Sequence, residues 1–453
     1  MESTCSSESC GKGPATRYRC RYVTARWEAG LKDIARSALF GGLIVAGTVV
    51  VPGASASAAC PDPATGSVPL APISSTDKPV VFRGSGSGHG LGMSQYGARG
   101  AGLLGCSATE ILTTYYRGAR RASIAVPSSI GVWMLESGTS ATVMVESDST
   151  RSATVRWRQK QRLVAVQSEG TTWTLRQTGS IVTLIDHTGR TRFSKTAPGQ
   201  SLIADHSGVV VRLRTFAGST LRIDRRNKWD YARFDYTAAG LDAQQWFRDN
   251  AEGPAMNKYL YGVAEIPPTW PAATQQAQAI AARTFAVRVN RVLYATSRDQ
   301  YYAGHNPVQD APTSAWRRAV EATTGSVMVD GYGRPIEAFY SASAAGFTEN
   351  NRYVWGGSGV SYLQAVDDSA WANASSDPYA QWSTSFTKSE IATAFGFTSV
   401  STVTVGAKGS ASRLQGVRIT GEDDGVTVTR SYTGGNVVQR LGMRSPGFVI
   451  TMR

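Results

Sequence analysis

Acidic residues are scarce in this sequence of 453 residues, where 33 Asp and Glu stand against 47 Lys and Arg and give a net charge of +14 at pH 7. Such a charge favours an acidic partner, namely nucleic acid, anionic lipid or an anionic cell-wall polymer. The basic residues are scattered, and no run of five or six occurs. We therefore expect no nucleic-acid partner, because a nucleic-acid-binding tail concentrates its charge.

The residue patterns of metal sites and of several common enzymes are also missing. None of the four histidines lies in a Cys-x-x-Cys or His-Glu-x-x-His context, so we expect no structural or peptidase-type zinc site. The glycine-rich loop 84–92 lacks the Lys-Ser/Thr pair that ends a P-loop. No Gly-x-Ser-x-Gly nucleophile elbow is present. The sequence predicts neither a metal nor a cofactor.

The one long apolar run covers residues 38–51 and is too short for a membrane span. Three basic residues precede it within 26–36, and the alternating small residues 54–58 follow it. This order is typical of a secretory signal peptide. We expect 1–58 to be a leader and signal peptide, with translation starting beyond the polar residues 1–25. The mature protein is then secreted to the cell wall, with no stable membrane span after cleavage.

Cysteine usage agrees with export. Of the five cysteines, only Cys60 and Cys106 follow the expected cleavage region. Two cysteines outside the reducing cytosol are candidates for one disulfide.

The composition divides the rest of the chain into four segments. Residues 59–78 are rich in Pro, Ser, Ala and Thr and form an expected linker. Residues 79–120 contain a strand at 79–83, a glycine-dense loop and a helix at 107–116. Ser107 and Glu110 form an expected capping box at the start of that helix.

Residues 121–250 alternate polar and apolar side chains in short runs, for example at 153–158, 172–176 and 209–214. This period of two predicts an all-β section. In 251–453 the clearest element is an alanine-rich helix from Pro271 to about Tyr294.

Further along the chain, we expect a hairpin at 325–345 around Asp330-Gly331-Tyr332-Gly333 and a short helix followed by strands from Phe386. The predicted fold class is α+β. It is β-rich, with a central alanine-rich helix packed on mixed sheets and an inserted all-β section.

Glu265 is the candidate for acid–base chemistry. It lies between the apolar, strand-like run Tyr259–Ala264 and a proline-rich turn that opens the alanine-rich helix, and no other Asp or Glu lies between Glu252 and Asp299. A lone acid in such a place suits a general acid. A surface carboxylate that favours a helix N-terminus is the alternative.

Five segments form a further set of motifs, namely Gly86-Ser-Gly-His89-Gly-Leu-Gly-Met93-Ser94-Gln95-Tyr96-Gly97, the Glu265 segment, Tyr340-Ser341-Ala-Ser343-Ala-Ala-Gly346-Phe-Thr348, Tyr362–Asp368 and Arg440–Ser445. Together they resemble the SpoIID/LytB domain of peptidoglycan-active proteins. The resemblance runs from about Phe82 to Val449. The Gly-His-Gly block precedes the β-section here, whereas in the sporulation protein it lies near the C-terminus. Some members bind zinc after the main helix, but residues 297–310 hold His305 and no cysteine, so the metal is not carried over.

The resemblance implies a lytic transglycosylase that cuts the MurNAc–GlcNAc bond of peptidoglycan glycan strands, with Glu265 as general acid. The 6-hydroxyl of the same MurNAc would attack, which explains a single carboxylate where ordinary glycosidases need two. Burial near Ile266 and Trp270 would raise the pKa of the acid. The alternative from the same family is a non-catalytic, wall-binding activator of a peptidoglycan amidase, with that wall amidase as its partner.

The remaining candidate residues have two open interpretations each. We expect a set of polar residues to bind substrate, namely His89, Ser94, Gln95, Gln278, Arg283, Ser341, Ser343 and Thr348. Arg283 is equally well explained as a structural hydrogen-bond hub, and His89 as a buried, satisfied histidine. A buried hairpin of small residues would also explain the serines and the threonine of 341–348. Trp270, Tyr259 and Tyr261 are either core residues or sugar-stacking platforms.

Overall fold

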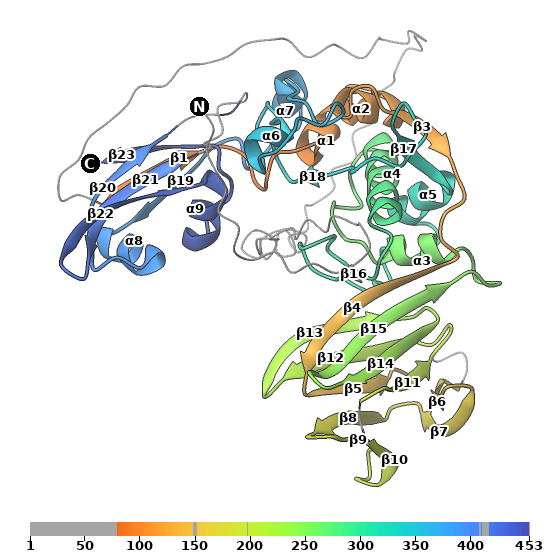
Figure 1. Cartoon of the computed structure of the whole chain (residues 1–453). Helices are drawn as coiled ribbons and strands as arrows, with labels where there is room; N and C mark the ends of the chain where they lie inside the picture. The colour runs from red at the N-terminus through yellow and green to blue at the C-terminus, as the bar shows by residue number, and fades with distance from the viewer. Residues whose placement is uncertain (1–78, 148–151, 197, 407–408, 410–415, 453) are drawn as a thin grey trace, which may run out of the picture.

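The computed structural model describes residues 79–147, 152–196, 198–406, 409 and 416–452. The expected leader, signal peptide and linker at 1–78 lie outside these residues. Figure 1 shows three regions: a β-sandwich at lower right, a helical region above it, and a β-rich lobe to the left of the helices. The α+β class is confirmed, with strands more abundant than helices.

The β-sandwich is formed by the segment for which the sequence predicts an all-β section. One sheet has the order β10-β9-β8-β5-β12-β13, and the other β16-β4-β15-β14-β11-β6-β7. The first sheet comprises β5 (Ser140–Val145), β8 (Thr172–Thr178), β9 (Ile181–Ile185), β10 (Thr191–Thr196), β12 (Val211–Ala217) and β13 (Thr220–Asn227). The second comprises β4 (Ser129–Gly138), β6 (Thr154–Gln159), β7 (Arg162–Ser168), β11 (Gln200–Asp205), β14 (Tyr231–Thr237), β15 (Gly240–Arg248) and β16 (Leu293–Tyr294).

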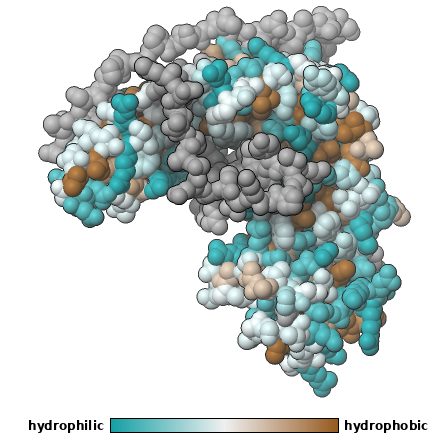
Figure 2. Space-filling model, viewed as in Figure 1, coloured by the Kyte–Doolittle hydropathy of each residue, from teal (hydrophilic) through white to brown (hydrophobic). Residues whose placement is uncertain are grey.

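Alternating side chains build the interior of the sandwich. In β14, for instance, every second residue is buried, as expected when one face of each sheet covers a core. Trp157 of one sheet stacks on Trp173 of the other, with ring centroids 6.3 Å apart. Figure 2 shows the visible face of the sandwich as mainly hydrophilic, with apolar residues in small scattered groups.

The helical region is built around the alanine-rich helix α4 (Ala272–Val289), which contacts several other helices and a short ribbon. Its other helices are α1 (Gln95–Leu103), α2 (Ala108–Tyr115), α3 (Ala255–Tyr261), α5 (Ala315–Ala322), α6 (Asn351–Val354) and α7 (Ser369–Ala374). Two ribbons complete it: β3 (Arg120–Ser123) with β17 (Ser326–Val329), antiparallel, and β2 (Met93–Ser94) with β18 (Tyr340–Ser341), parallel. Small residues allow close packing, since a Cβ on Gly100 of α1 would overlap the Trp371 carbonyl of α7.

The third region joins the two ends of the described chain. Its first sheet places β1 (Val80–Gly84) between β19 (Trp382–Phe386) and β23 (Phe448–Met452). Its second sheet contains β20 (Ser399–Val405), β21 (Val417–Asp423) and β22 (Val426–Tyr432), and the helices are α8 (Lys388–Phe395) and α9 (Gly434–Leu441). This region has its own apolar core, in which Phe82 contacts Phe386 and Phe448.

Several sequence predictions for individual elements are confirmed. The capping box is present: the Ser107 hydroxyl accepts the Glu110 N–H, and the Glu110 carboxylate accepts the Ser107 N–H. Helix α4 begins directly after Pro271, as expected. It ends at Val289 rather than near Tyr294 because Asn290 adopts a left-handed conformation (φ 46°) that caps the helix.

Two local predictions need correction. The run Tyr259–Ala264 is not a strand: its first three residues end helix α3, all seven residues of which are buried, and its last three form a turn with an isolated bridge from Val263 to Tyr302. A short, uniformly apolar run has no periodicity that separates a buried strand from a buried helix. The turn of the expected hairpin around Asp330–Gly333 is present: the Asp330 N–H donates to the Arg334 carbonyl, and the chain returns antiparallel with a bridge from Val329 to Pro335 and a bond from the Ile336 N–H to the Met328 carbonyl. The pairing between the two arms is shorter than expected, and β17 pairs along its length with β3 instead.

Candidate active site around Glu265

Glu265 lies in the turn between α3 and α4, beside a second segment of chain. Gly262 ends α3, and a Cβ there would overlap the Tyr302 ring. Residues 262–264 pair with 301–303: the Ala303 N–H donates to the Gly262 carbonyl (2.8 Å) and the Ala264 N–H to the Tyr301 carbonyl (3.1 Å). This pairing directs the Tyr301 N–H at Glu265 Oε1, at 2.6 Å.

The Glu265 carboxyl is closely surrounded by protein while the residue keeps partial contact with solvent. Burial raises its pKa from 4.5 to about 7, because removal from water disfavours the charged form. Hydrogen bonds from the Tyr301 N–H, the Tyr340 hydroxyl and the Gln95 side chain oppose this rise. All three donors are neutral, so no positive charge among them cancels the effect of burial. With a pKa of about 7 the carboxyl exchanges between its protonated and ionised forms near neutral pH, as general acid–base catalysis requires.

Neutral polar side chains fix the residues that contact Glu265. The Tyr340 hydroxyl lies 3.4 Å from Glu265 Oε1 and accepts a hydrogen bond from Gln300 Nε2 at 2.9 Å. The Tyr259 hydroxyl in turn donates to Gln300 Oε1 at 2.6 Å. A buried, connected network of this kind holds its members in one arrangement.

Two motif segments far apart in the sequence meet beside this acid. The parallel pairing of β2 with β18 places Met93 opposite Tyr340 and Ser94 opposite Ser341. The next residue after Ser94 is Gln95, which contacts Glu265 and also donates from Nε2 to Gln278 Oε1 at 3.3 Å. The structure therefore brings together Glu265, Gln95 and Gln278 from the predicted set.

The serines and the threonine of the predicted set hold backbone groups. Ser94 caps α1 by accepting the Gly97 N–H at 3.2 Å and also accepts the Ala344 N–H at 3.1 Å. The other three acceptors are Ser341 Oγ for the Gly90 N–H (3.3 Å), Ser343 Oγ for the Ala345 N–H (3.0 Å) and Thr348 Oγ1 for the Val366 N–H (2.8 Å). All four side chains are buried, which fits the structural interpretation of these residues.

His89 and Arg283 occupy different surroundings. His89 Nδ1 accepts the Leu91 N–H at 2.9 Å, and its partly exposed ring contacts Phe339 and Trp355. Arg283 is fully buried, and its guanidinium donates to the carbonyls of Val320, Thr323 and Ser326. Arg283 is thus a hydrogen-bond hub at the end of α5.

The aromatic residues near the acid separate into core and surface. Tyr259 and Tyr261 are buried core residues. Trp270 is partly exposed; its ring contacts Tyr96 at 4.9 Å between centroids, with the Arg99 guanidinium 5.8 Å from its centroid.

Sequence reasoning missed two residues that contact the acid, Tyr301 and Tyr340. Tyr340 stands inside a motif used for the resemblance, whereas nothing in the sequence marks Tyr301, which acts through its backbone N–H.

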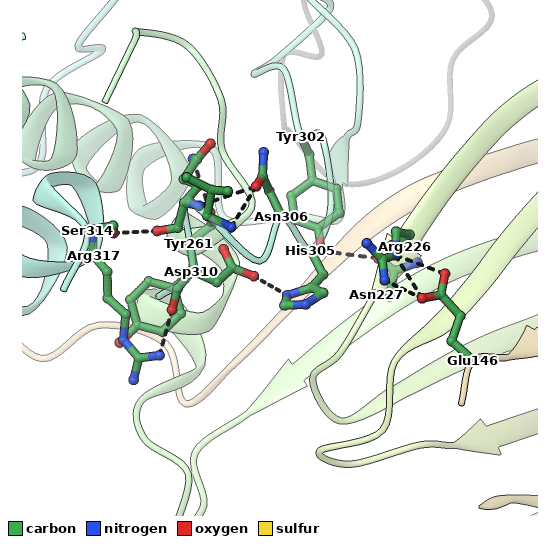
Figure 3. Close-up of polar contacts among 12 residues, drawn as sticks. Glu146, Arg226, Asn227, Tyr261, Tyr302, His305, Asn306, Asp310, Ser314 and Arg317 are labelled. Atoms are coloured by element: carbon green, nitrogen blue, oxygen red, sulfur yellow. Dashed lines mark hydrogen bonds and ion pairs between the residues drawn. The ribbon is translucent and has the colours of Figure 1, made fainter. Parts of the chain in front are cut away.

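The predictions on metals and cysteines fall partly outside the described region. Within it, no group of three or more His, Cys, Asp and Glu residues could hold a metal ion. His305 instead pairs through Nδ1 with the carboxylate of Asp310 (Figure 3). Cys106 forms a disulfide. Cys60 lies outside the described residues, so its pairing with Cys106 stays a prediction.

Comparison with known proteins points to one family. The sequence model of the SpoIID family, described as stage II sporulation protein, matches residues 250–329, which include Glu265 and α4. The amidase enhancer of Bacillus subtilis (strain 168) is 32% identical over 130 residues, which cover 28% of this chain and 17% of that protein. No solved structure is significantly similar to this chain. The matched region contains Glu265, and the Gly-His-Gly and Tyr-Ser motifs meet beside that acid; together with the similarity to the amidase enhancer, this supports the SpoIID/LytB family for residues 250–329 and the segments packed against them.

Proposed function

We propose that this protein is a lytic transglycosylase that cleaves MurNAc–GlcNAc bonds in peptidoglycan glycan strands, with Glu265 as general acid. The observation that carries the proposal is the state of Glu265: burial raises its pKa to about 7, and neutral donors surround it. A proton donor of this kind is matched to reaction near neutral pH.

The chemistry requires one carboxyl group. Glu265 donates its proton to the glycosidic oxygen as the bond from that oxygen to C1 of MurNAc breaks. The 6-hydroxyl of the same MurNAc attacks C1 and forms the 1,6-anhydro ring, and its proton returns to Glu265. No water enters, so the second carboxylate that directs water or forms a covalent intermediate in other glycosidases is not needed.

The surroundings of the acid suit a glycan. Gln95 and Gln278 are buried and keep the interior beside the acid neutral, Gln95 against Glu265 and Gln278 against Gln95, and the partly exposed Trp270 offers an aromatic face near the same turn. His89 and Trp355 form a second partly exposed aromatic pair. The net charge of +14 favours association with an anionic wall. We propose a secreted or wall location on the basis of the signal-peptide pattern in 1–58. Within the described ranges, no helix is long and apolar enough to cross a membrane.

A second candidate function is favoured by the similarity to a protein named amidase enhancer. In that case the protein binds the wall and stimulates a peptidoglycan amidase without cutting glycan itself. Such a role does not require a protonated Glu265.

Product chemistry separates the two functions. Purified protein is incubated with intact and with peptide-stripped peptidoglycan, and 1,6-anhydro products are measured by mass spectrometry. Glu265→Gln should abolish these products. Glu252→Gln makes the same chemical change at an exposed carboxylate of the same segment and should release them at the wild-type rate.

Anhydro products released by Glu265→Gln at close to the wild-type rate would refute the acid assignment. Stimulation of an amidase by both variants, with no anhydro products from the wild type, would support the enhancer role instead.

A further inference from the structure

The loop 299–305 connects the acid to the β-sandwich. Its Tyr301 N–H donates to Glu265, and the residues that follow are bonded to the last residues of β13. The contacts are the His305 N–H to the Arg226 carbonyl (2.6 Å), Arg225 Nε to the Tyr302 carbonyl (3.2 Å) and the Tyr302 hydroxyl to Asn227 Oδ1 (3.2 Å). Figure 3 shows Tyr302 and His305 facing this end of β13, where Arg226 also pairs with Glu146.

The loop and the strand approach each other closely at Gly304. Gly304 has a φ of +82°, and a Cβ there would overlap the Arg226 carbonyl oxygen. The Arg225 guanidinium lies 5.4 Å from the centroid of the Tyr301 ring. The residue that donates to Glu265 is therefore held from the sandwich side.

A second connection to the sandwich is made by the helix that precedes the acid. Lys258 of α3 forms an ion pair with Asp230, which lies between β13 and β14, at 2.7 Å, and both side chains are fully buried. Lys258 also donates to Asn250 Oδ1 at 2.9 Å. Because α3 leads directly into the Glu265 turn, this pair fixes the chain that precedes the acid.

The apolar core is continuous across the same boundary. The Phe247 ring of β15 packs against Tyr259 of α3 and Tyr302 of the loop, with centroids 6.2 and 5.9 Å apart. Tyr259 and Tyr302 stack on each other at 5.9 Å. The sandwich and the acid-bearing turn thus share one close-packed core, through which a displacement on one side is felt on the other.

We propose that the β-sandwich is a positioning element for the acid: Arg225 and Gly304 fix loop 299–305 so that the Tyr301 N–H remains on the Glu265 carboxylate. The inference rests on the proposed role of Glu265. It gives the inserted sandwich a task in the reaction, in addition to any contact with the wall. Arg225 and Gly304 are positioning residues, since they act on Glu265 only through Tyr301.

The expected change has a defined direction. The Tyr301 N–H favours the ionised form of Glu265, so its loss should raise the pKa of Glu265 further. The titratable side chains coupled to Glu265 are Tyr259 and Tyr340, whose own pKa values lie well above 10 and which stay neutral through the relevant range. A rise in the pKa of Glu265 therefore reports the lost donor.

The test compares two variants with matched controls. Gly304→Ala is matched by Gly189→Ala, which has a φ of +83° and open space around the new methyl group. Arg225→Met is matched by Arg222→Met, an exposed position on the same strand. The measurements are the hydrogen exchange of the Tyr301 amide, the titration of carbon-13-labelled Glu265 by NMR, and the pH profile of glycan cleavage.

Gly304→Ala and Arg225→Met should speed Tyr301 exchange about tenfold or more. They should also raise the Glu265 pKa by about one unit, the change expected when a carboxylate loses one charge-assisted hydrogen bond. In the cleavage assay, kcat should fall with little change in KM. The alkaline limb of the pH profile should move to higher pH. The two control variants should behave as wild type.

Unchanged Tyr301 exchange and Glu265 titration in both test variants would overturn the proposal. If Gly304→Ala does not fold, Arg225→Met makes the same comparison alone. If exchange and titration shift but no variant or wild type cleaves glycan, the positioning role stands and the proposed reaction fails.

Discussion

Replacing Glu265 by Gln should stabilise the protein at alkaline pH while it abolishes cleavage. The folded-state pKa of Glu265 is raised from 4.5 to about 7, so the folded protein holds the proton more tightly than the unfolded chain. Between pH 4.5 and about pH 7 the folded state binds more protons than the unfolded state. The free energy of unfolding therefore falls as pH rises through this range. Above pH 7 the accumulated loss is about 3 kcal/mol, since each pKa unit corresponds to about 1.4 kcal/mol. Because Glu265 keeps partial contact with solvent, this loss in the free energy of unfolding is an upper bound.

The glutamine variant does not carry that loss, because its amide does not ionise and its oxygen can still accept the Tyr301 N–H. Chemical denaturation at pH 4 and pH 8 measures the effect. At pH 4 the two proteins should differ little, whereas at pH 8 Glu265→Gln should be more stable by up to about 3 kcal/mol. Other buried acids, such as Asp368 with a pKa of about 6, titrate in both proteins and cancel in the difference.

Activity provides the second half of this prediction. General acid catalysis contributes about 10²- to 10⁴-fold in rate, and Glu265→Gln should lose an amount of this order. Glu252→Gln is the control for both measurements. A stability difference for Glu265→Gln that is the same at pH 4 and pH 8 would refute the argument that this carboxyl is protonated in the folded protein.

Three further predictions follow from described contacts. The rate of anhydro-product release should fall about tenfold per pH unit above pH 7, as Glu265 loses its proton; a rate that is constant to pH 9 would contradict the acid role. Lys258→Met should lower the free energy of unfolding by about 3–5 kcal/mol, because it leaves Asp230 charged and unpaired in the interior. Adding Asp230→Asn should recover part of this loss in denaturant unfolding monitored by tryptophan fluorescence, and a double variant no more stable than Lys258→Met would argue against the pair. Arg283→Met should cost about 3 kcal/mol because the carbonyls at the end of α5 lose their donors. Arg283→Lys should restore only part of the thermal stability, since lysine lacks the planar fork, and full restoration would show that the fork geometry is unimportant.

Local sequence patterns were sufficient to predict many individual elements. Alternation in the β-section predicted β6, β8 and β12, because side chains of a strand alternate between a core and a solvent face. Ser107 and Glu110 marked the start of α2, since a capping box needs only residues three positions apart. The same locality explains the failure at α3, where all residues, the polar Asn257 and Lys258 included, are buried, so the helix has no exposed polar face that would reveal its period.

Glu265 can be recognised from the sequence as a solitary acid ahead of an alanine-rich helix, and the motifs that resemble the SpoIID/LytB domain can be read there as well. The surroundings of that acid depend on the packing of distant segments. Tyr301 and Tyr340 follow Glu265 by tens of residues, and they reach it through the pairing of 301–303 with 262–264 and of β18 with β2. The raised pKa arises from burial by these distant segments, and burial is a property of the packed molecule rather than of any local run of residues.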